Sequence, residues 1–370
     1  MRIALICPYD VAVPGGVQHQ SLALSRALRA GGDEVLLLAP GTPGAPLAGA
    51  SGLSLGVGQG HKVAVNGSVA PLTLSPVALG RALRALRAFG PDVVHVQEPF
   101  APLLALGTTL ARVAPAVGTF HRCGTDRLYR AAAPLLGRTA RRLDVLVAVS
   151  EAARATLAGV IGARGAAAVI VPNGVDLPAG DACGRREAAG VPDVVFVGRH
   201  EERKGLRDLL EAFTSSAVAA RLVVIGDGPA RAGLEARFAR DERVVFAGAV
   251  DDAAKADALA GATLLIAPAR GGESFGVVLL EAMAAGAAVL ATDLPGYREA
   301  AGDAARYVPP GDVAALRTAL ADLLEDRGAR RALEHAGRRR AQRYSITALA
   351  ETYRGLYASA IASGRRAPRS

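Results

Sequence analysis

The sequence predicts an α/β protein with two doubly wound domains, each built on a parallel sheet. Its 370 residues, 51% of them hydrophobic and 21% charged, exceed one ordinary core and supply material for two. Short apolar runs alternate with amphipathic helical stretches, which is typical of βαβ units. This alternation occurs twice, on either side of a turn-rich segment at 171–176. Two Rossmann-like domains are therefore expected.

The first series of predicted strands consists of near-continuous apolar runs, as in parallel strands covered on both faces. These strands are Arg2–Cys7, Glu34–Ala39, Val93–Gln97, Ala116–Thr119 and Val145–Val149. A helix is predicted over Val17–Ala30, because Gly31 and Gly32 end the pattern. Residues 41–60, rich in Gly, Pro and Ala, are expected to form a long surface loop.

The second series has the same character. Its strands are Val194–Val197, Arg221–Ile225, Val244–Ala247, Thr263–Ala267 and Ala288–Thr292. We expect domains at 1–171 and 172–345, with a C-terminal helix at 346–362 that packs back on the first domain.

Several classes of protein are disfavoured by simple counts. No run of eighteen apolar residues exists, so no spanning helix is expected, and the first residues run into Pro8 without a signal sequence. The three cysteines are odd in number and far apart, which argues against a disulfide framework or zinc cluster and suits a reducing cytoplasm.

The charge is unevenly distributed. The net charge is +9, yet residues 1–172 carry 16 Lys plus Arg against 8 Asp plus Glu, a net of +8. The first half is therefore expected to face an anionic partner. Nucleic acid is disfavoured, because only 4% of residues are aromatic and no binding motif occurs.

One predicted basic helix is a candidate for contact with that anionic partner. Ser75 and Pro76 suit the N-cap and first helical position. After them Arg81, Arg84 and Arg87 recur every three residues, opposite a leucine-rich face. Two interpretations stay open: contact with anionic lipid headgroups, or a solvated face in an Arg-rich protein.

Two loops suit an anionic ligand. Gly15 and Gly16 follow the first strand and open a helix, where backbone can approach a ligand, although a plain tight turn is the alternative. Arg199 and Lys204 follow the strand at 194–197 and suit a diphosphate, unless they pair with neighbouring glutamates.

The sharpest motif is a pair of glutamates, Glu273 and Glu281, separated by seven residues. Glu273 is expected in a loop, and the backbone N–H groups at the start of the following helix can hold phosphate or sugar oxygens. These belong to Ser274, Phe275, Gly276 and Val277. Glu281 lies about two turns into an apolar helix, so a hydroxyl-bearing ligand is a plausible partner for its carboxylate.

With these motifs the chain resembles the retaining glycosyltransferases of family 4, whose GT-B fold has two Rossmann-like domains facing a cleft. The resemblance covers nearly the whole chain and is strongest to the phosphatidylinositol mannosyltransferase subgroup. Segments carrying it include Cys7-Pro8-Tyr9, Pro14–Gln18, Asn66–Ala70, Thr119-Phe120-His121, Asn173–Asp176 and Gly271–Gly276.

The resemblance implies a role for each matching residue. The first domain would bind the acceptor and the second the nucleotide sugar. Catalytic roles fall to His121, Glu273, Arg199 and Lys204. Donor binding falls to Gly16 at the diphosphate, Asp252 and Lys255 at the base, Glu281 at the ribose, and Ser274–Val277. Tyr9, Gln18, Asn66 and Ser68 would line the acceptor pocket.

Three departures fall mainly on the acceptor side. Pro71 stands where the subgroup usually has an arginine for the acceptor phosphate, and Arg122-Cys123-Gly124 replaces a Thr/Ser-rich run after His121. The loop from Arg199 to Lys204 is one residue shorter than expected, which leaves the role of Arg203 open.

The implied reaction transfers a hexose, mannose from GDP-mannose, to a phosphatidylinositol-like lipid at the inner face of the plasma membrane. No D-x-D triplet occurs, so no obligatory metal is expected. Three alternatives stay open: a family 4 transferase using a UDP- or GDP-sugar on a soluble acceptor, a non-hydrolysing sugar-nucleotide epimerase, and a non-catalytic membrane-binding protein. The oligomeric state is also open.

Overall fold

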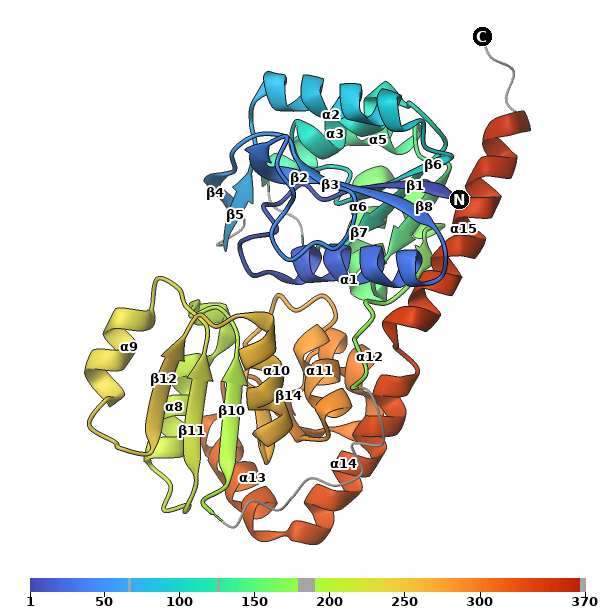
Figure 1. Ribbon diagram of the computed structural model, residues 1–370. Helices are drawn as coiled ribbons and strands as arrows, with labels where there is room; N and C mark the ends of the chain where they lie inside the picture. Colours follow the sequence, from blue (N-terminus) through green and yellow to red (C-terminus); the bar gives the residue numbers. More distant parts are fainter. Residues whose placement is uncertain (66–67, 125–126, 179–189, 367–370) are drawn as a thin grey trace. The chain divides into compact units, whose positions relative to one another are not determined.

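The computed structural model describes residues 1–65, 68–124, 127–178 and 190–366, and it divides into two units (Figure 1). The first unit comprises Met1–Gly174 and Ile346–Ser370, and the second comprises Val175–Ser345.

The first unit contains a parallel sheet of seven strands in the order β3-β2-β1-β6-β7-β8-β9. These strands are β1 (Arg2–Ile6), β2 (Glu34–Pro43), β3 (Ser54–Gly56), β6 (Val93–Gln97), β7 (Ala116–Phe120), β8 (Val145–Ala148) and β9 (Val169–Ile170). A separate antiparallel hairpin pairs β4 (His61–Val65) with β5 (Ser68–Leu72). The strand order reverses beside β1, and ligands of open α/β sheets bind at the carboxyl ends of strands at such a point.

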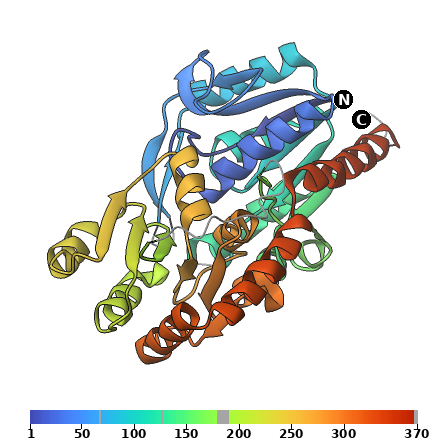
Figure 2. The same cartoon turned by 60° about the horizontal axis from the view of Figure 1, so that its bottom comes forward.

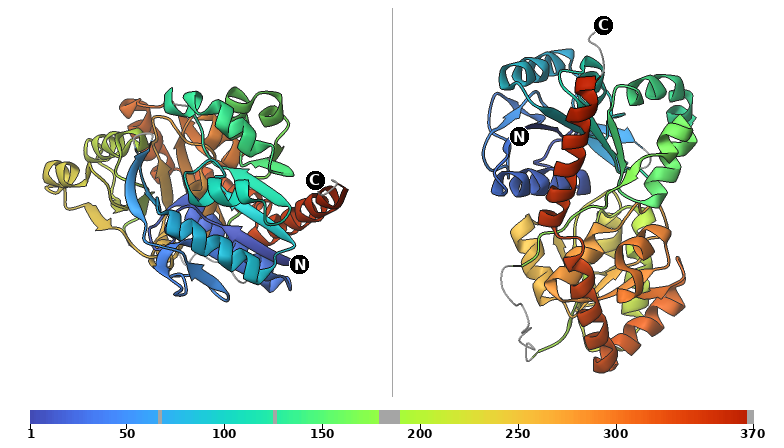
Figure 3. Two further views of the ribbon diagram at one scale, coloured as in Figure 1. Left: turned by 90° about the horizontal axis from the view of Figure 1, so that it is seen from above. Right: turned by 90° about the vertical axis from the view of Figure 1, so that its right-hand side faces the viewer.

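Helices cover both faces of this sheet. They are α1 (Gly16–Ala30), α2 (Pro76–Phe89), α3 (Leu104–Ala111), α4 (Arg127–Ala131), α5 (Ala133–Ala140), α6 (Glu151–Ile161), α7 (Ala163–Ala166) and α15 (Ile346–Arg366). Alternate residues of β1 face opposite ways: Leu5 packs in a cluster with Tyr357 of α15, whereas Ile6 packs in a cluster with Leu86 of α2. The helix α15 thus belongs to the first unit, and Figure 3 shows it as the red helix along that unit.

The second unit repeats the plan with six parallel strands in the order β12-β11-β10-β13-β14-β15. They are β10 (Asp193–Val197), β11 (Arg221–Ile225), β12 (Val244–Gly248), β13 (Leu264–Ala267), β14 (Ala288–Thr292) and β15 (Arg306–Val308). The helices are α8 (Leu206–Thr214), α9 (Arg231–Phe238), α10 (Asp252–Gly261), α11 (Val277–Ala285), α12 (Pro295–Ala301), α13 (Val313–Glu325) and α14 (Arg327–Gln342), with short 3₁₀ turns η1 (Glu202–Lys204) and η2 (Gly302–Ala304). Figure 2 shows α8 and α10 on opposite sides of β10–β12.

The two doubly wound sheets confirm the predicted fold class, but the interpretation of residues 41–60 as a loop is wrong. Strand β2 continues to Pro43, and β3 pairs with it inside that segment. Gly56 permits this pairing, because a Cβ there would lie 2.3 Å from the carbonyl oxygen of Thr42. The segment therefore forms an edge of the sheet, although its Gly-rich composition predicted a loop.

Several arginines close helix ends. Guanidinium groups donate to carbonyl oxygens in the last turns of α1, α5, α12 and α13, which lack partners within the helix. The donors are Arg354 to Leu28, Arg164 to Ala140, Arg340 to Ala300, and Arg330 to Leu323. Part of the basic excess is thus structural.

Candidate functional site

Glu273 lies in the loop between β13 and α11 and meets two cations. Its side chain is 10% exposed, Lys204 Nζ lies 2.7 Å from its Oε1, and Arg203 Nη1 donates to the same oxygen at 3.1 Å. Lys204 ends η1, which follows β10, the neighbour of β13. The adjacent strands therefore bring the predicted Glu273 and Lys204 together.

Close backbone contacts hold the two loops together. Gly205 adopts a positive φ of 68°, and a Cβ there would lie 1.9 Å from the carbonyl oxygen of Pro268. The N–H of Arg270 donates to the carbonyl oxygen of Arg203 at 2.8 Å. The guanidinium of Arg270 also donates twice to the buried Asp208 of α8, at 2.8 and 2.6 Å. Such a bidentate pair fixes the approach of the loop.

Arg199 belongs to the same group of charges through Glu201. Glu201 Oε1 lies 2.9 Å from Arg199 Nε without good hydrogen-bond geometry, while its Oε2 accepts from Arg203 Nε at 3.0 Å. Arg203, whose role the sequence left open, therefore bridges Glu201 and Glu273. Three cations face two carboxylates, which leaves one positive charge in this cluster.

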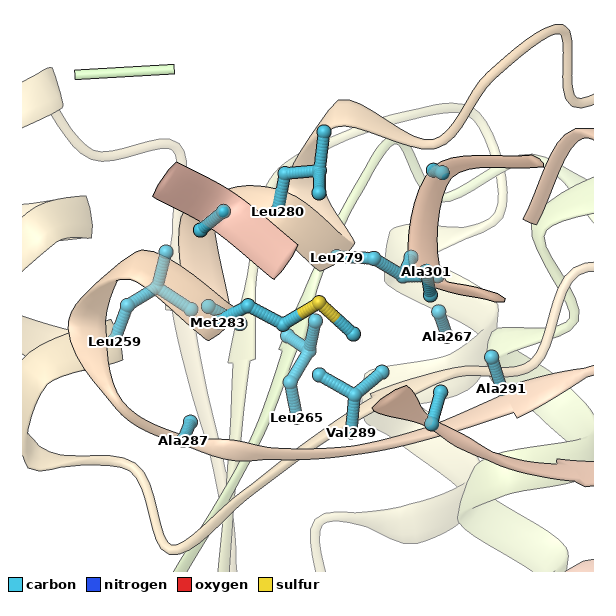
Figure 4. Packing of buried hydrophobic residues seen from close by; sticks show 14 of the residues in the cluster. Leu259, Leu265, Ala267, Leu279, Leu280, Met283, Ala287, Val289, Ala291 and Ala301 are labelled. Carbon is cyan, nitrogen blue, oxygen red and sulfur yellow. The ribbon is translucent and has the colours of Figure 1, made fainter. Parts of the chain in front are cut away.

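The start of α11 adjoins this cluster. Its N-cap is Gly276, with a φ of 92° and no side-chain cap, so the first N–H groups of the helix are not satisfied by a capping side chain. A Cβ at Gly276 would lie 2.5 Å from the Tyr297 ring. The helix is anchored by its core face, where Met283 points toward Leu265 and Val289 (Figure 4).

Glu281 has a protein partner. Lys255 Nζ of α10 donates to Glu281 Oε1 at 3.0 Å and lies 3.3 Å from the exposed carboxylate of Asp252. Burial lowers the pKa of Lys255, but the two carboxylates outweigh it, so the pKa is raised. A ligand hydroxyl is therefore not required to explain the half-buried Glu281, because Lys255 already compensates it.

In the first unit, His121 lies just beyond β7, beside residues that end β6. The N–H of His121 donates to Glu98 Oε1 at 2.7 Å, and its Nε2 lies 2.7 Å from Gln97 Oε1. Burial raises the pKa of Glu98 to about 7 and lowers that of His121 to about 3. Glu98 also adopts a φ of 46°, which is uncommon for a residue with a side chain and often marks a functional site.

The structure describes some of the other residues that were predicted to bind the acceptor. Tyr9 follows β1, and its pKa is raised by burial and then by the nearby Glu98. Gln18 is buried over Gly15, where a Cβ would lie 2.4 Å from Gln18 Oε1, whereas Gly16 has open space at that position. Asn66 and the side chain of Ser68 lie outside the described residues.

Sequence reasoning missed Gln97 and Glu98 as partners of His121. The signal was present, because polar residues follow the apolar run of β6 at the carboxyl end of a strand beside β1.

The basic helix α2 uses its apolar face internally. Ala82 and Leu86 are buried against the sheet, while Arg81, Arg84 and Arg87 are exposed. Near the start of α2, two large apolar side chains are exposed, Leu74 at 46% and Val77 at 60%. In the part of the chain described, no helix has the length and apolar character to cross a membrane, and no group of three His, Cys, Asp or Glu residues could hold a metal ion.

Comparison with known proteins gives consistent matches over both units. Residues 14–178 match the family described as Glycosyltransferase Family 4, and residues 191–326 match Glycosyl transferases group 1. The chain is 36% identical to a phosphatidyl-myo-inositol mannosyltransferase of Mycobacterium leprae, with 99% of each chain covered. It is 37% identical to the protein of that name from Mycobacterium tuberculosis, again with 99% coverage of both.

Solved structures share the fold at lower identity. A sucrose-phosphate synthase from Thermosynechococcus elongatus has a TM-score of 0.75 and 22% identity, covering 98% of this chain and 99% of its own. The Anabaena protein HepE, solved with UDP and glucose, has a TM-score of 0.74 and 17% identity, covering 97% and 100%.

Proposed function

Because the chain belongs to glycosyltransferase family 4, and is therefore a glycosyltransferase, we propose that it transfers mannose from GDP-mannose to a phosphatidylinositol-type lipid. The full-length similarity to proteins named phosphatidyl-myo-inositol mannosyltransferase supports mannose as the transferred sugar and phosphatidylinositol as the acceptor. In the structure, the observation that carries the proposal is the grouping of Lys204, Arg203 and Glu273 beside the uncapped start of α11.

The second unit binds the donor in this proposal. Arg199, Lys204 and the N–H groups at the start of α11 hold the diphosphate, because cations and free helix N–H groups both favour an anion. Glu273 accepts from sugar hydroxyls. Glu281 accepts from the ribose, with Asp252 and Lys255 at the base. Gly16, at the start of α1, is assigned to the diphosphate from its motif.

The transfer retains the anomeric configuration. The bond between the sugar C1 and the phosphate oxygen breaks, a bond from C1 to the acceptor oxygen forms on the same face, and the departing phosphate takes the acceptor proton. Positive charge around the diphosphate stabilises the leaving group. No divalent ion is obligatory in the proposed reaction.

The first unit binds the acceptor in this proposal. His121 and Tyr9 meet the sugar and acceptor, together with Gln18, Asn66 and Ser68. The exposed Arg81, Arg84 and Arg87 bring the protein to the anionic inner face of the membrane as a peripheral protein. A soluble acceptor is the second candidate, favoured by Pro71, which replaces the arginine expected for a lipid phosphate.

The test combines donor binding with transfer. GDP-mannose should raise the unfolding temperature more than UDP-glucose or UDP-N-acetylglucosamine, because binding stabilises the folded state by mass action. The protein should then mannosylate phosphatidylinositol in vesicles, giving an α-linked product. An inverted product would contradict the mechanism, transfer only to a soluble inositol phosphate would support the second candidate, and turnover of the donor without an acceptor would indicate an epimerase.

A further inference from the structure

A series of hydrogen bonds between buried polar side chains runs through the first unit from α15 to His121. Tyr357 Oη lies 2.7 Å from His95 Nδ1. On the other side of that ring, His95 Nε2 lies 2.8 Å from Thr119 Oγ1 and 3.3 Å from Gln97 Nε2. Gln97 Oε1 then lies 2.7 Å from His121 Nε2. Two histidines are thereby linked through a single amide.

Burying these polar side chains costs free energy, and the unbroken series of hydrogen bonds between them offsets that cost. Tyr357, His95 and Thr119 are each at most 1% exposed, and a polar group without a partner is strongly destabilising in such surroundings. Burial lowers the pKa of both His95 and His121 to about 3. Both rings are therefore neutral near pH 7, so each carries one N–H donor and one bare nitrogen acceptor.

Gln97 couples the two rings, because its amide has one accepting end and one donating end. Its oxygen faces His121 Nε2, which must therefore carry the proton and donate. Its nitrogen faces His95 Nε2, which must accept, as it also does from the Thr119 hydroxyl. His95 is then protonated at Nδ1 and donates to Tyr357 Oη.

We propose that Tyr357, acting through His95 and Gln97, is a positioning residue that holds His121 in the Nε2–H form and so leaves Nδ1 as an acceptor for a substrate hydroxyl. The inference rests on the proposed function, in which His121 faces the reacting sugar. Within the described residues Nδ1 has no hydrogen-bond partner, and His121 is 8% exposed, so the ring is fixed at one nitrogen and available at the other.

The competing state has the donor and acceptor roles of these hydrogen bonds reversed. If the Gln97 amide turns over, its N–H donates to His121 Nε2, and His121 then carries its proton on Nδ1. His95 must then be protonated at Nε2. The Tyr357 hydroxyl accepts from His95 Nδ1–H in the first state and donates to the bare Nδ1 in the second. Its removal leaves a buried N–H without an acceptor in the first state and a bare ring nitrogen in the second. An N–H without an acceptor is the more costly of the two, so the variant shifts toward the second state.

The experiment uses Tyr357→Phe in the full chain labelled with ¹⁵N-histidine. The sequence has six histidines, so His121 can be assigned with single His→Asn variants. Long-range ¹H–¹⁵N spectra should show His121 protonated at Nε2 in the wild type, with a substantial Nδ1–H population in Tyr357→Phe. A wild-type His121 protonated at Nδ1, or an unchanged tautomer in the variant, would overturn the inference. If Tyr357→Phe does not fold, Gln97→Met cuts the same coupling and should give the same mixture.

Kinetics separate positioning from stability. Tyr357→Phe should lower kcat roughly tenfold, the size expected for losing one oriented hydrogen bond, with the KM for the donor unchanged. Tyr307→Phe is the matched control: it removes a hydroxyl that donates to the carbonyl oxygen of Gly302 in the second unit, and should leave kcat unchanged. Equal losses in both variants would indicate a structural role only. If the wild type transfers no sugar but the tautomer changes as stated, the proposed function fails and the coupling stands.

Discussion

Lys204 Nζ lies 2.7 Å from Glu273 Oε1, so the cation predicted to bind phosphate and the carboxylate predicted to bind sugar neutralise each other. Arg203 supports the same oxygen from a second direction. When a nucleotide sugar binds here, contacts of these side chains with its diphosphate and hydroxyls replace the ion pairs that they make with one another. The pair thus keeps both side chains in place before the ligand arrives.

Replacement of Glu273 by Gln should reduce transfer roughly 100-fold or more, because it weakens interactions with the sugar that strengthen in the transition state. The unfolding temperature should change little, since Lys204 and Arg203 are partly exposed and can be solvated. Steady-state kinetics measures the effect. Glu202→Gln, at a glutamate 89% exposed in the adjacent turn, is the control and should stay active. Full activity of Glu273→Gln would remove Glu273 from the site.

Replacement of Lys204 by Met should weaken donor binding and reduce its dependence on salt, because one point charge facing the diphosphate is lost. Titration calorimetry at low and high salt checks both effects. Arg207→Gln changes the same charge at an exposed position of α8 and should leave affinity nearly intact. Identical salt dependence in Lys204→Met and wild type would contradict the assignment.

Loss of Lys255 should destabilise the second unit by about 3 kcal/mol, because Glu281 then becomes a half-buried carboxylate without its cation. The double variant Lys255→Met/Glu281→Leu should recover most of this loss, since a neutral apolar pair has no uncompensated charge. Denaturant unfolding of the two single variants and the double variant measures the coupling. Strict additivity of the two single changes would show that the pair does not interact.

Glu98 should make stability fall as pH rises. Burial raises its pKa from 4.5 to about 7, so the folded state binds the proton more tightly than the unfolded state. Its contribution is complete below pH 4.5 and is lost through pH 7, a loss of roughly 3 kcal/mol. His95 and His121, with lowered pKa values, change stability in the opposite direction below pH 6.5.

Comparison of Glu98→Gln with the wild type isolates the glutamate, because the histidines are common to both proteins. The amide oxygen can still accept from the N–H of His121. Unfolding temperatures measured from pH 4.5 to 8 should therefore converge at the acid end and favour the variant at the alkaline end. Parallel curves would mean that Glu98 does not titrate in this range.

The triple change of Arg81, Arg84 and Arg87 to Gln should weaken binding to vesicles that contain phosphatidylinositol. At about 1 kcal/mol for each cation near an anionic surface, the affinity should fall roughly 100-fold. The control triple Arg317, Arg339 and Arg343 to Gln removes the same charge from exposed positions of the second unit. Vesicle co-sedimentation compares them, and equal losses would indicate net charge rather than a surface on α2.

The sequence predicted those parts of the fold whose signal is local. Strands β6, β11 and β14 match the predicted bounds because each is an uninterrupted apolar run between turn residues. The edge strands β3, β9 and β15 were missed, since two or three residues carry no detectable period.

The candidate site likewise contains residues that local motifs predict and contacts that depend on tertiary packing. Glu273 and Lys204 could be named from motifs, and adjacent strands bring them together. The bridging position of Arg203 depends on how two loops pack, and the link from His121 to Tyr357 joins residues far apart in the chain, so neither has a local signature.

The helix α15 has a consequence for the order in which the protein assembles. Residues 1–174 leave the ribosome first, yet their sheet lacks one covering helix until residues 346–366 have been made. The second unit is continuous in sequence and can fold in the meantime. Until α15 docks, His95 and the apolar side chains around Leu5 lack the cover of that helix, and transiently exposed apolar surface of this kind is prone to aggregation.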